Sequence, residues 1–111
     1  MGRPITKKGI KEKELAQWTK AIKERDNYTC QICLRYLKDG PPQNCQAHHI
    51  LDKVNFPHLR LDLMNGITLC YSNHKVGKYS AHLNPLFFAE WLKKNKPDVY
   101  YYLMEKGGIS V

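Results

Sequence analysis

The hydrophobic and polar positions divide the chain into an arm, a central segment and a C-terminal segment. Residues 1–10 are basic and include Gly and Pro, which predicts a loose arm. Over residues 11–26, the side chains of Leu15, Trp18 and Ile22 recur at helical spacing among charged and polar ones. This pattern predicts an amphipathic helix with one apolar stripe.

The central segment, residues 11–83, continues beyond this helix with strand-like patterns. Residues 47–51 form a short strand-like run, and the Asn65-Gly66 pair predicts a turn. In residues 67–69 two apolar side chains flank a threonine, which predicts a second short strand. The alternation then stops, and His74 falls on the first turns of a predicted helix.

The C-terminal segment, residues 84–111, predicts two helices. Asn84 suits the N-cap of the first helix, and Pro85 suits its first position. Residues 95–98 interrupt the pattern, and the second helix is expected from Asp98 to about Lys106, before two glycines. The apolar face of the first helix is expected to contain Leu86, Phe87, Phe88, Trp91 and Leu92. Together the segments predict an α+β domain, in which a strand–strand–helix core is flanked by an N-terminal helix and a C-terminal helical pair.

The size and charge of the chain narrow its class. A chain of 111 residues predicts one domain with a small core, which a structural metal or another cross-link would help to stabilise. Eighteen Lys and Arg against ten Asp and Glu give a net charge of +8 with neutral histidines. Such an excess favours a polyanionic partner, most commonly nucleic acid. A basic protein without such a partner is the alternative.

Hydropathy and cysteine content bear on the compartment. No run approaches the length of an apolar membrane span, and residues 1–8 lack the apolar segment of a signal peptide. We therefore expect an intracellular protein with reduced thiols and no membrane partner.

Cys30 and Cys33 form a Cys-x-x-Cys pair, whose thiolates can bind one zinc ion. Cys45 is expected to fill the core.

Three histidines and an Asn-Gly pair carry the strongest chemical pattern. Asn65 follows His49 by sixteen residues, and His74 follows Asn65 by nine. Neighbouring side chains of a strand point to opposite faces, so His48 and His49 can serve one site only if the backbone bends there. A lone histidine is ordinarily a surface residue or a satisfied core residue, but this ordered set favours a chemical site.

These residues resemble the HNH endonuclease family, whose ββα-metal core (the His-Me finger) carries its motif on a strand, a loop, a strand and a helix. The matching motifs are His-His-Ile at 48–50, Asn-Gly-Ile-Thr-Leu-Cys at 65–70 and His74, and the resemblance covers roughly residues 18–75. It implies that His48 and His74 hold a divalent metal ion. It also implies that His49 is the general base and that Asn65 orients His49 by tying the loop to the strand.

The resemblance implies a metal-dependent DNA endonuclease that hydrolyses phosphodiester bonds and leaves 5′ phosphates. Small stand-alone enzymes of this kind are frequent in bacteriophages, so we expect a phage-encoded monomer or weak dimer that acts in the host cytoplasm. Imidazole ligands permit Mn, Ni, Co or Zn as well as Mg. The alternative is a noncatalytic zinc-knuckle module that binds nucleic acid through the same basic surface.

A structural zinc ion is a further expectation from the family. Many members use two Cys-x-x-Cys pairs, but the second pair is here Cys70 and Asn73, and asparagine is a poor zinc ligand. Three interpretations follow. Cys30, Cys33 and Cys70 could share a zinc ion with water or another group, a rearranged site could use Cys45, or the chain could bind no zinc.

Four more side chains are candidates for the site. Some family members place another metal ligand one helical turn after the last histidine, where this chain has Lys78. His82 becomes a candidate metal ligand if the chain turns back after Gly77. Arg60, in the loop between the strands, is a candidate phosphate ligand, with a structural pair with Asp62 or a backbone carbonyl as the alternative. Lys75 and Lys78 are expected to contact DNA.

Overall fold

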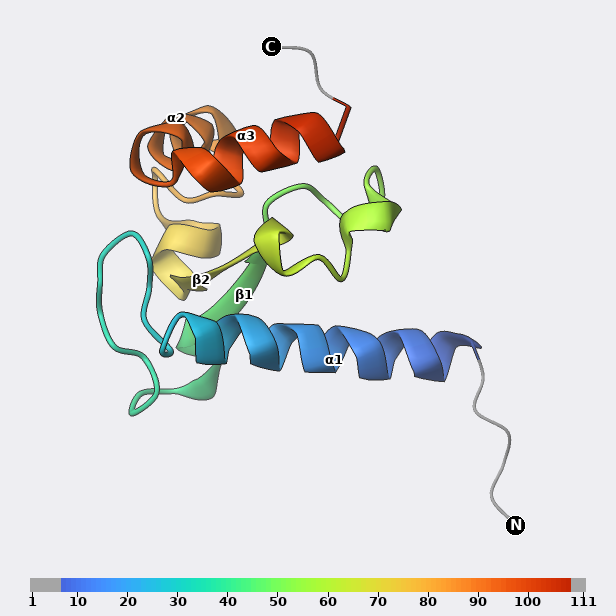
Figure 1. Ribbon diagram of the computed structural model, residues 1–111. Coiled ribbons are helices and arrows are strands. Elements are labelled where there is room, and N and C mark those ends of the chain that lie inside the picture. The colour runs from blue at the N-terminus through green and yellow to red at the C-terminus, as the bar shows by residue number, and fades with distance from the viewer. Residues whose placement is uncertain (1–6, 109–111) are drawn as a thin grey trace.

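A two-stranded antiparallel sheet lies between one long helix and a pair of shorter helices (Figure 1). The structure, a computed structural model, describes residues 7–108, with side chains from residue 11 onward. Its helices and strands are α1 (Lys7–Arg25), β1 (Cys45–His49), β2 (Gly66–Cys70), α2 (Pro85–Asn95) and α3 (Pro97–Lys106). The predicted α+β fold class is confirmed. No helix within residues 7–108 is long and apolar enough to cross a membrane.

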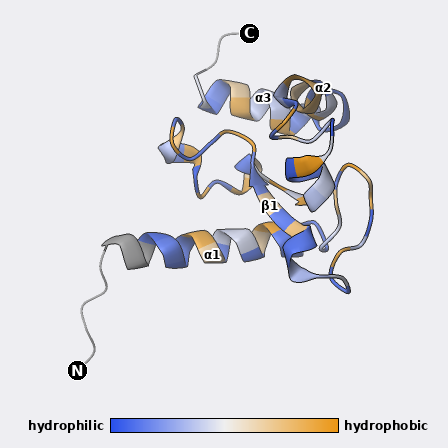
Figure 2. Ribbon diagram, turned by 180° about the vertical axis from the view of Figure 1, so that it is seen from behind, coloured by the Kyte–Doolittle hydropathy of each residue, from blue (hydrophilic) through white to orange (hydrophobic). Residues whose placement is uncertain are grey.

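The two faces of the sheet have different neighbours. β1 pairs with β2 in a register that places Cys45 opposite Cys70 and His49 opposite Gly66. Because side chains alternate along a strand, His49 faces α1 whereas His48 faces α2. Figure 2 shows β1 as a mainly hydrophilic strand, although both faces of the sheet are covered. All five residues of β2 are buried, so both sides of this strand belong to the interior.

Gly66 has a different role from the predicted one. A short 3₁₀ turn, Leu63–Asn65, precedes β2 and ends at Asn65, and Gly66 is already extended, with φ −136° and ψ 150°, so the expected turn does not include the glycine. A Cβ atom at Gly66 would lie 2.5 Å from the ring of Trp18 and 2.6 Å from the side chain of Ile22. The glycine therefore permits close packing of α1 on the sheet.

The C-terminal end of α1 is tied to β2 by polar contacts. The Arg25 guanidinium donates to the backbone oxygens of Leu63 at 2.6 Å and Gly66 at 2.8 Å. Asp26 accepts a hydrogen bond from the backbone N–H of Thr68 at 2.9 Å.

α1 begins at Lys7, four residues earlier than expected, because lysine and isoleucine are adequate helix formers there. The predicted arm is shorter by those four residues, and its first six lie outside the described residues.

After β2 the chain forms a single helical turn instead of the predicted longer helix. This π-helical turn, Ser72–Val76, ends at Gly77, whose backbone N–H donates to the carbonyl of Ser72 at 2.8 Å. Gly77 is extended, and the chain folds back over the turn. The backbone N–H groups of Ala81 and His82 then donate to the carbonyls of Asn73 and His74, at 2.8 and 3.0 Å.

The C-terminal helices begin and end close to the predicted positions. The Asn84 side chain accepts from the backbone N–H of Phe87 at 3.1 Å, as an N-cap should, and Pro97 opens α3. The apolar face of α2 is narrower than predicted, because only Phe88 and Leu92 are fully buried. Leu86 is 81% exposed and Phe87 40% exposed, since both lie off the stripe that contacts the sheet and α3.

Candidate metal centres and active site

Three histidines from three segments lie close together on one side of the sheet. His48 comes from β1, His74 from the π-helical turn and His82 from the loop that follows it. Their candidate ligand nitrogens all lie within 4.8 Å of one another, and Nε2 of His74 is 2.9 Å from Nε2 of His82. We call this set the histidine cluster. His82 reaches it because the chain turns back after Gly77, which was the condition for including it as a candidate.

Gln46 orients one ring of this cluster. Its side-chain oxygen contacts Nδ1 of His74. An amide oxygen can only accept a hydrogen bond, so Nδ1 of His74 carries the proton and Nε2 keeps its lone pair. That lone pair is on the nitrogen that lies beside His82. Metal-binding histidines characteristically donate their second N–H to such a partner, which fixes the orientation of the ring.

The surroundings keep the imidazoles of His48 and His74 neutral. Burial, together with His74 and His82, lowers the pKa of His48 to about 3. Burial, together with His82 and Lys75, lowers the pKa of His74 to about 4. Both side chains are therefore unprotonated near neutrality, which is the form that binds a metal ion.

The histidine cluster fits a divalent metal ion. A metal–imidazole bond is about 2.0–2.1 Å long, so nitrogens that share one ion lie about 3–4 Å apart. The nitrogens of the cluster meet this requirement after small adjustments, since all lie within 4.8 Å of one another. Three imidazole ligands would leave other coordination positions open, as in a catalytic site.

His49 lies on the other face of β1. Its ring stacks on Trp18 with centroids 3.9 Å apart and planes inclined by 9°. Its Nε2 contacts the backbone oxygen of Arg60 at 2.9 Å. The carbonyl can only accept, so Nε2 is protonated and Nδ1 can take up a proton. Burial lowers the pKa of His49, against the opposing effect of the Arg60 carbonyl.

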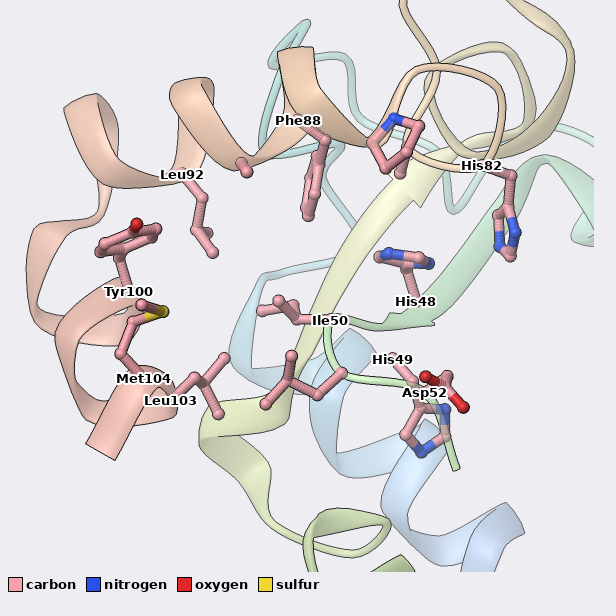
Figure 3. Close-up of a pocket in the computed structure, with 14 residues that line it drawn as sticks. His48, His49, Ile50, Asp52, His82, Phe88, Leu92, Tyr100, Leu103 and Met104 are labelled. Carbon is pink, nitrogen blue, oxygen red and sulfur yellow. The ribbon is translucent and has the colours of Figure 1, made fainter. Parts of the chain in front are cut away.

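His48 and His49 nevertheless line one cavity. His49 is the last residue of β1, and the chain bends directly after it. The cavity lies between this bend and the helices α2 and α3, and both histidines contribute to its wall (Figure 3). The two neighbours therefore point to opposite faces of the sheet, as predicted, and still border a shared space.

Asn65 connects the start of β2 to the segment that follows β1. Its side chain is fully buried. The side-chain oxygen accepts from the backbone N–H of Leu51 at 2.7 Å, and the NH₂ group donates to the carbonyls of Leu51 and Leu59 at 2.9 and 3.1 Å. Its backbone oxygen accepts from the N–H of Ile50. These bonds fix the chain on both sides of His49, so the arrangement suits a positioning role.

Three cysteines form a second possible metal site, which we call the cysteine cluster. Cys30, Cys33 and Cys70 have their sulfur atoms within 4.8 Å of one another, and Sγ of Cys33 lies 3.9 Å from Sγ of Cys70. The backbone N–H of Cys33 contacts Sγ of Cys30, and the backbone N–H of Asn73 contacts Sγ of Cys70, each at 3.5 Å. Cys45 is buried in the core and is not part of the cluster, contrary to the rearranged-site interpretation.

Asn73 lies where a fourth cysteine would complete this site. Its side-chain NH₂ group donates to Sγ of Cys30 at 3.4 Å and to Sγ of Cys70 at 3.2 Å. Burial alone would raise the pKa of Cys30, but these donors and nearby backbone N–H groups hold it below its ordinary value. Burial and the neighbouring sulfurs raise the pKa of Cys33. The surroundings therefore favour a thiolate at Cys30 over one at Cys33.

The three basic candidates have different neighbours. Arg60 pairs with Glu14 at 3.2 Å, a structural ion pair, although the expected partner among the alternatives was Asp62 or a carbonyl. Lys75 and Lys78 are exposed, and the Lys78 ammonium lies 5.4 Å from the centroid of the Tyr79 ring. These two lysines are available to a polyanion.

Two residues of the site were missed by the sequence analysis. Gln46 precedes His48 by two residues, so the strand period alone places both on one face, and this could have marked it as a partner. Trp18 was assigned only to the apolar stripe of α1, and nothing in the sequence pairs it with His49.

Comparisons with protein-family models, with curated proteins and with solved structures find no match for this chain.

Proposed function

We propose that this protein is a metal-dependent DNA endonuclease that hydrolyses phosphodiester bonds at the histidine cluster. The observation that carries the proposal is the convergence of His48, His74 and His82 beside His49, whose ring is held by a backbone carbonyl. A noncatalytic module would not need the buried, neutral imidazoles of His48 and His74 on one side of a strand and an oriented imidazole on the other.

His48 and His74 would hold the divalent ion, with His82 as a third ligand. A divalent ion bound there supplies charge relief at the phosphate and stabilisation of the departing oxygen. Gln46 keeps the His74 ring in the orientation that presents Nε2. The roles of His48 and His74 are those that the HNH resemblance implies, and the role of His82 comes from its place in this fold.

His49 would act as the general base. Its Nε2 is bound to the Arg60 carbonyl, so Nδ1 is free to take a proton from water. The water oxygen then bonds to phosphorus while the bond from phosphorus to the 3′ oxygen breaks, and the 3′ oxygen takes a proton from solvent. Trp18 and Asn65 hold the base in place, through ring stacking and through hydrogen bonds to the adjoining loop.

DNA is the proposed substrate because of charge. The chain carries +8 with neutral histidines, and Lys75 and Lys78, one and four residues after His74, are exposed. Contacts with phosphates from such side chains position a nucleic acid without reading its sequence. We therefore propose modest sequence preference.

A plasmid-cleavage assay tests the proposal. Purified protein should nick or linearise supercoiled plasmid with Mg²⁺ or Mn²⁺, and EDTA should stop the reaction. His49→Ala should lower the rate on the order of 10²- to 10⁴-fold, with residual activity that rises with pH as hydroxide replaces the base. DNA binding without cleavage across Mg²⁺, Mn²⁺, Ni²⁺, Co²⁺ and Zn²⁺ would instead support the noncatalytic zinc-knuckle module.

A further inference from the structure

A cavity of about 460 Å³ opens beside the histidine cluster, between the end of β1 and the helices α2 and α3. Protein interiors are close-packed and rarely leave voids much larger than a water molecule. Small-molecule sites, by contrast, typically measure about 300–1,000 Å³ and are mostly apolar with a few polar groups. The size of this cavity therefore matches a ligand site.

The cavity has two chemically different ends (Figure 3). Its apolar end is formed by side chains from α2 and α3, among them Phe88, Leu92, Tyr100 and Leu103. Its polar end is formed by His48, His49, His82 and Asp52. In Figure 3 the helix side chains lie on one side of the space, and the histidines and Asp52 on the other.

This division fits one nucleotide of a nucleic acid. A phosphate belongs at the histidine end, where a metal ion would neutralise it. Every nucleobase has a flat face that can stack on an aromatic side chain, so this contact does not depend on which base is present. Phe88 and Tyr100 supply such aromatic rings. Asp52 lies at the same end as the histidines, and both of its carboxylate oxygens already accept hydrogen bonds from Asn55.

We propose that the cavity receives an unstacked nucleobase next to the scissile phosphate, so that the preferred substrate is DNA with an unpaired nucleotide at the cleavage site. This inference rests on the proposed endonuclease function and names its substrate class. A base within a duplex is stacked and paired, and extracting it costs free energy that an unpaired base does not require. Fully paired DNA is therefore the poorer substrate.

The test compares two DNA duplexes that differ by one base. Both contain a single bulged nucleotide at the same position, thymidine in one and an abasic analogue in the other, so their backbone charges are equal. Binding is measured by fluorescence anisotropy in EDTA, and cleavage is measured separately with Mn²⁺. Stacking of one base typically changes affinity by about 5- to 150-fold, so wild-type protein should favour the thymidine bulge by a factor in that range.

A cavity-filling variant supplies the structural control. Ala89 lines the cavity from α2, so Ala89→Trp should place an indole there and reduce the preference to about one. Leu86, on the same helix, is 81% exposed and does not line the cavity, so Leu86→Trp should keep the preference. If Ala89→Trp loses the wild-type circular dichroism spectrum, Met104→Trp fills the same cavity from α3.

The outcomes separate the two proposals. Equal wild-type affinity for the two bulges would overturn the base pocket, as would a preference that survives in a folded cavity-filling variant. A preference in EDTA that disappears on cavity filling supports the pocket even if Mn²⁺ yields no cleavage, and in that case the endonuclease function is the part that fails.

Discussion

The cysteine cluster and the histidine cluster each take one residue from the same short stretch of chain, Cys70 in the first and His74 in the second. They differ in what surrounds them. Cys30 and Cys70 are members of the hydrophobic core, and the side chain of Asn73 already contacts their sulfur atoms. The histidine cluster instead borders a cavity, and the side-chain oxygen of Gln46 contacts Nδ1 of His74.

This difference separates two kinds of site. A structural metal site is closed by four protein ligands, whereas a catalytic site keeps open positions and orients its ligands through a further shell of contacts. Each cluster has two buried members and one exposed member, so burial does not separate them. In the cysteine cluster Asn73 lies where a fourth ligand would be, whereas the histidine cluster borders a cavity and has an oriented ring. We therefore propose a structural role for the cysteine cluster and a catalytic role for the histidine cluster.

The largest expected effect comes from removing a ligand of the histidine cluster, compared with removing a member of the cysteine cluster. His74→Ala should lower Mn²⁺-dependent plasmid cleavage on the order of 10²- to 10⁴-fold, because metal charge stabilisation is worth several kcal/mol in the transition state. Raising the Mn²⁺ concentration should partly restore the rate. Cys33→Ser, measured per folded molecule, should change the rate only a few-fold. Equal losses in the two variants would remove the distinction between the clusters.

A smaller effect is expected from the partner of His74. Gln46→Leu removes the oxygen that orients the ring, and loss of such a partner typically costs about 10- to 100-fold in metal affinity. Isothermal titration with Mn²⁺ measures this change. Gln43→Leu is a matched control, since Gln43 is exposed in the preceding turn and should keep wild-type affinity. An unchanged affinity in Gln46→Leu would show that the ring needs no such support.

The smallest effect concerns the incomplete cysteine cluster. Asn73→Cys supplies a fourth thiolate next to Cys30 and Cys70, so it should tighten zinc binding and raise the Tm in zinc by roughly 4–8 °C for each kcal/mol gained. Asn73→Ala is the control, because it removes the amide without adding a ligand. Elemental analysis that finds no zinc in wild type or in Asn73→Cys would refute a metal role for this cluster.

The parts of the fold that follow from local chemistry could be predicted from the sequence. Asn84 and Pro85 mark the start of α2, and Pro97 separates it from α3, because caps and prolines act within a few residues. The strand at Gly66–Cys70 follows from its alternation, although the reason for its glycine does not. That reason is the close approach of Trp18 and Ile22, which are more than forty residues away in the chain.

The candidate site divides in the same way. The sequence motif singles out His48, His49, Asn65 and His74, but it does not show that His82 joins them. That step depends on the backbone turning back after Gly77, which brings the N–H of His82 to the carbonyl of His74. The stacking of Trp18 on His49 is likewise a tertiary contact between α1 and β1. Long-range packing of this kind leaves no local signal.

The central claim is that two neighbouring residues of one strand do different work, His48 as a metal ligand and His49 as the general base. Isothermal titration with Mn²⁺ on His48→Ala and His49→Ala, with the cleavage rate of each, tests it most directly. His49→Ala should bind Mn²⁺ with wild-type affinity and cleave on the order of 10²- to 10⁴-fold more slowly. His48→Ala should bind Mn²⁺ more weakly and recover part of its rate at high Mn²⁺. If His49→Ala loses the metal while His48→Ala keeps both metal binding and activity, the claim is contradicted and the two roles are reversed.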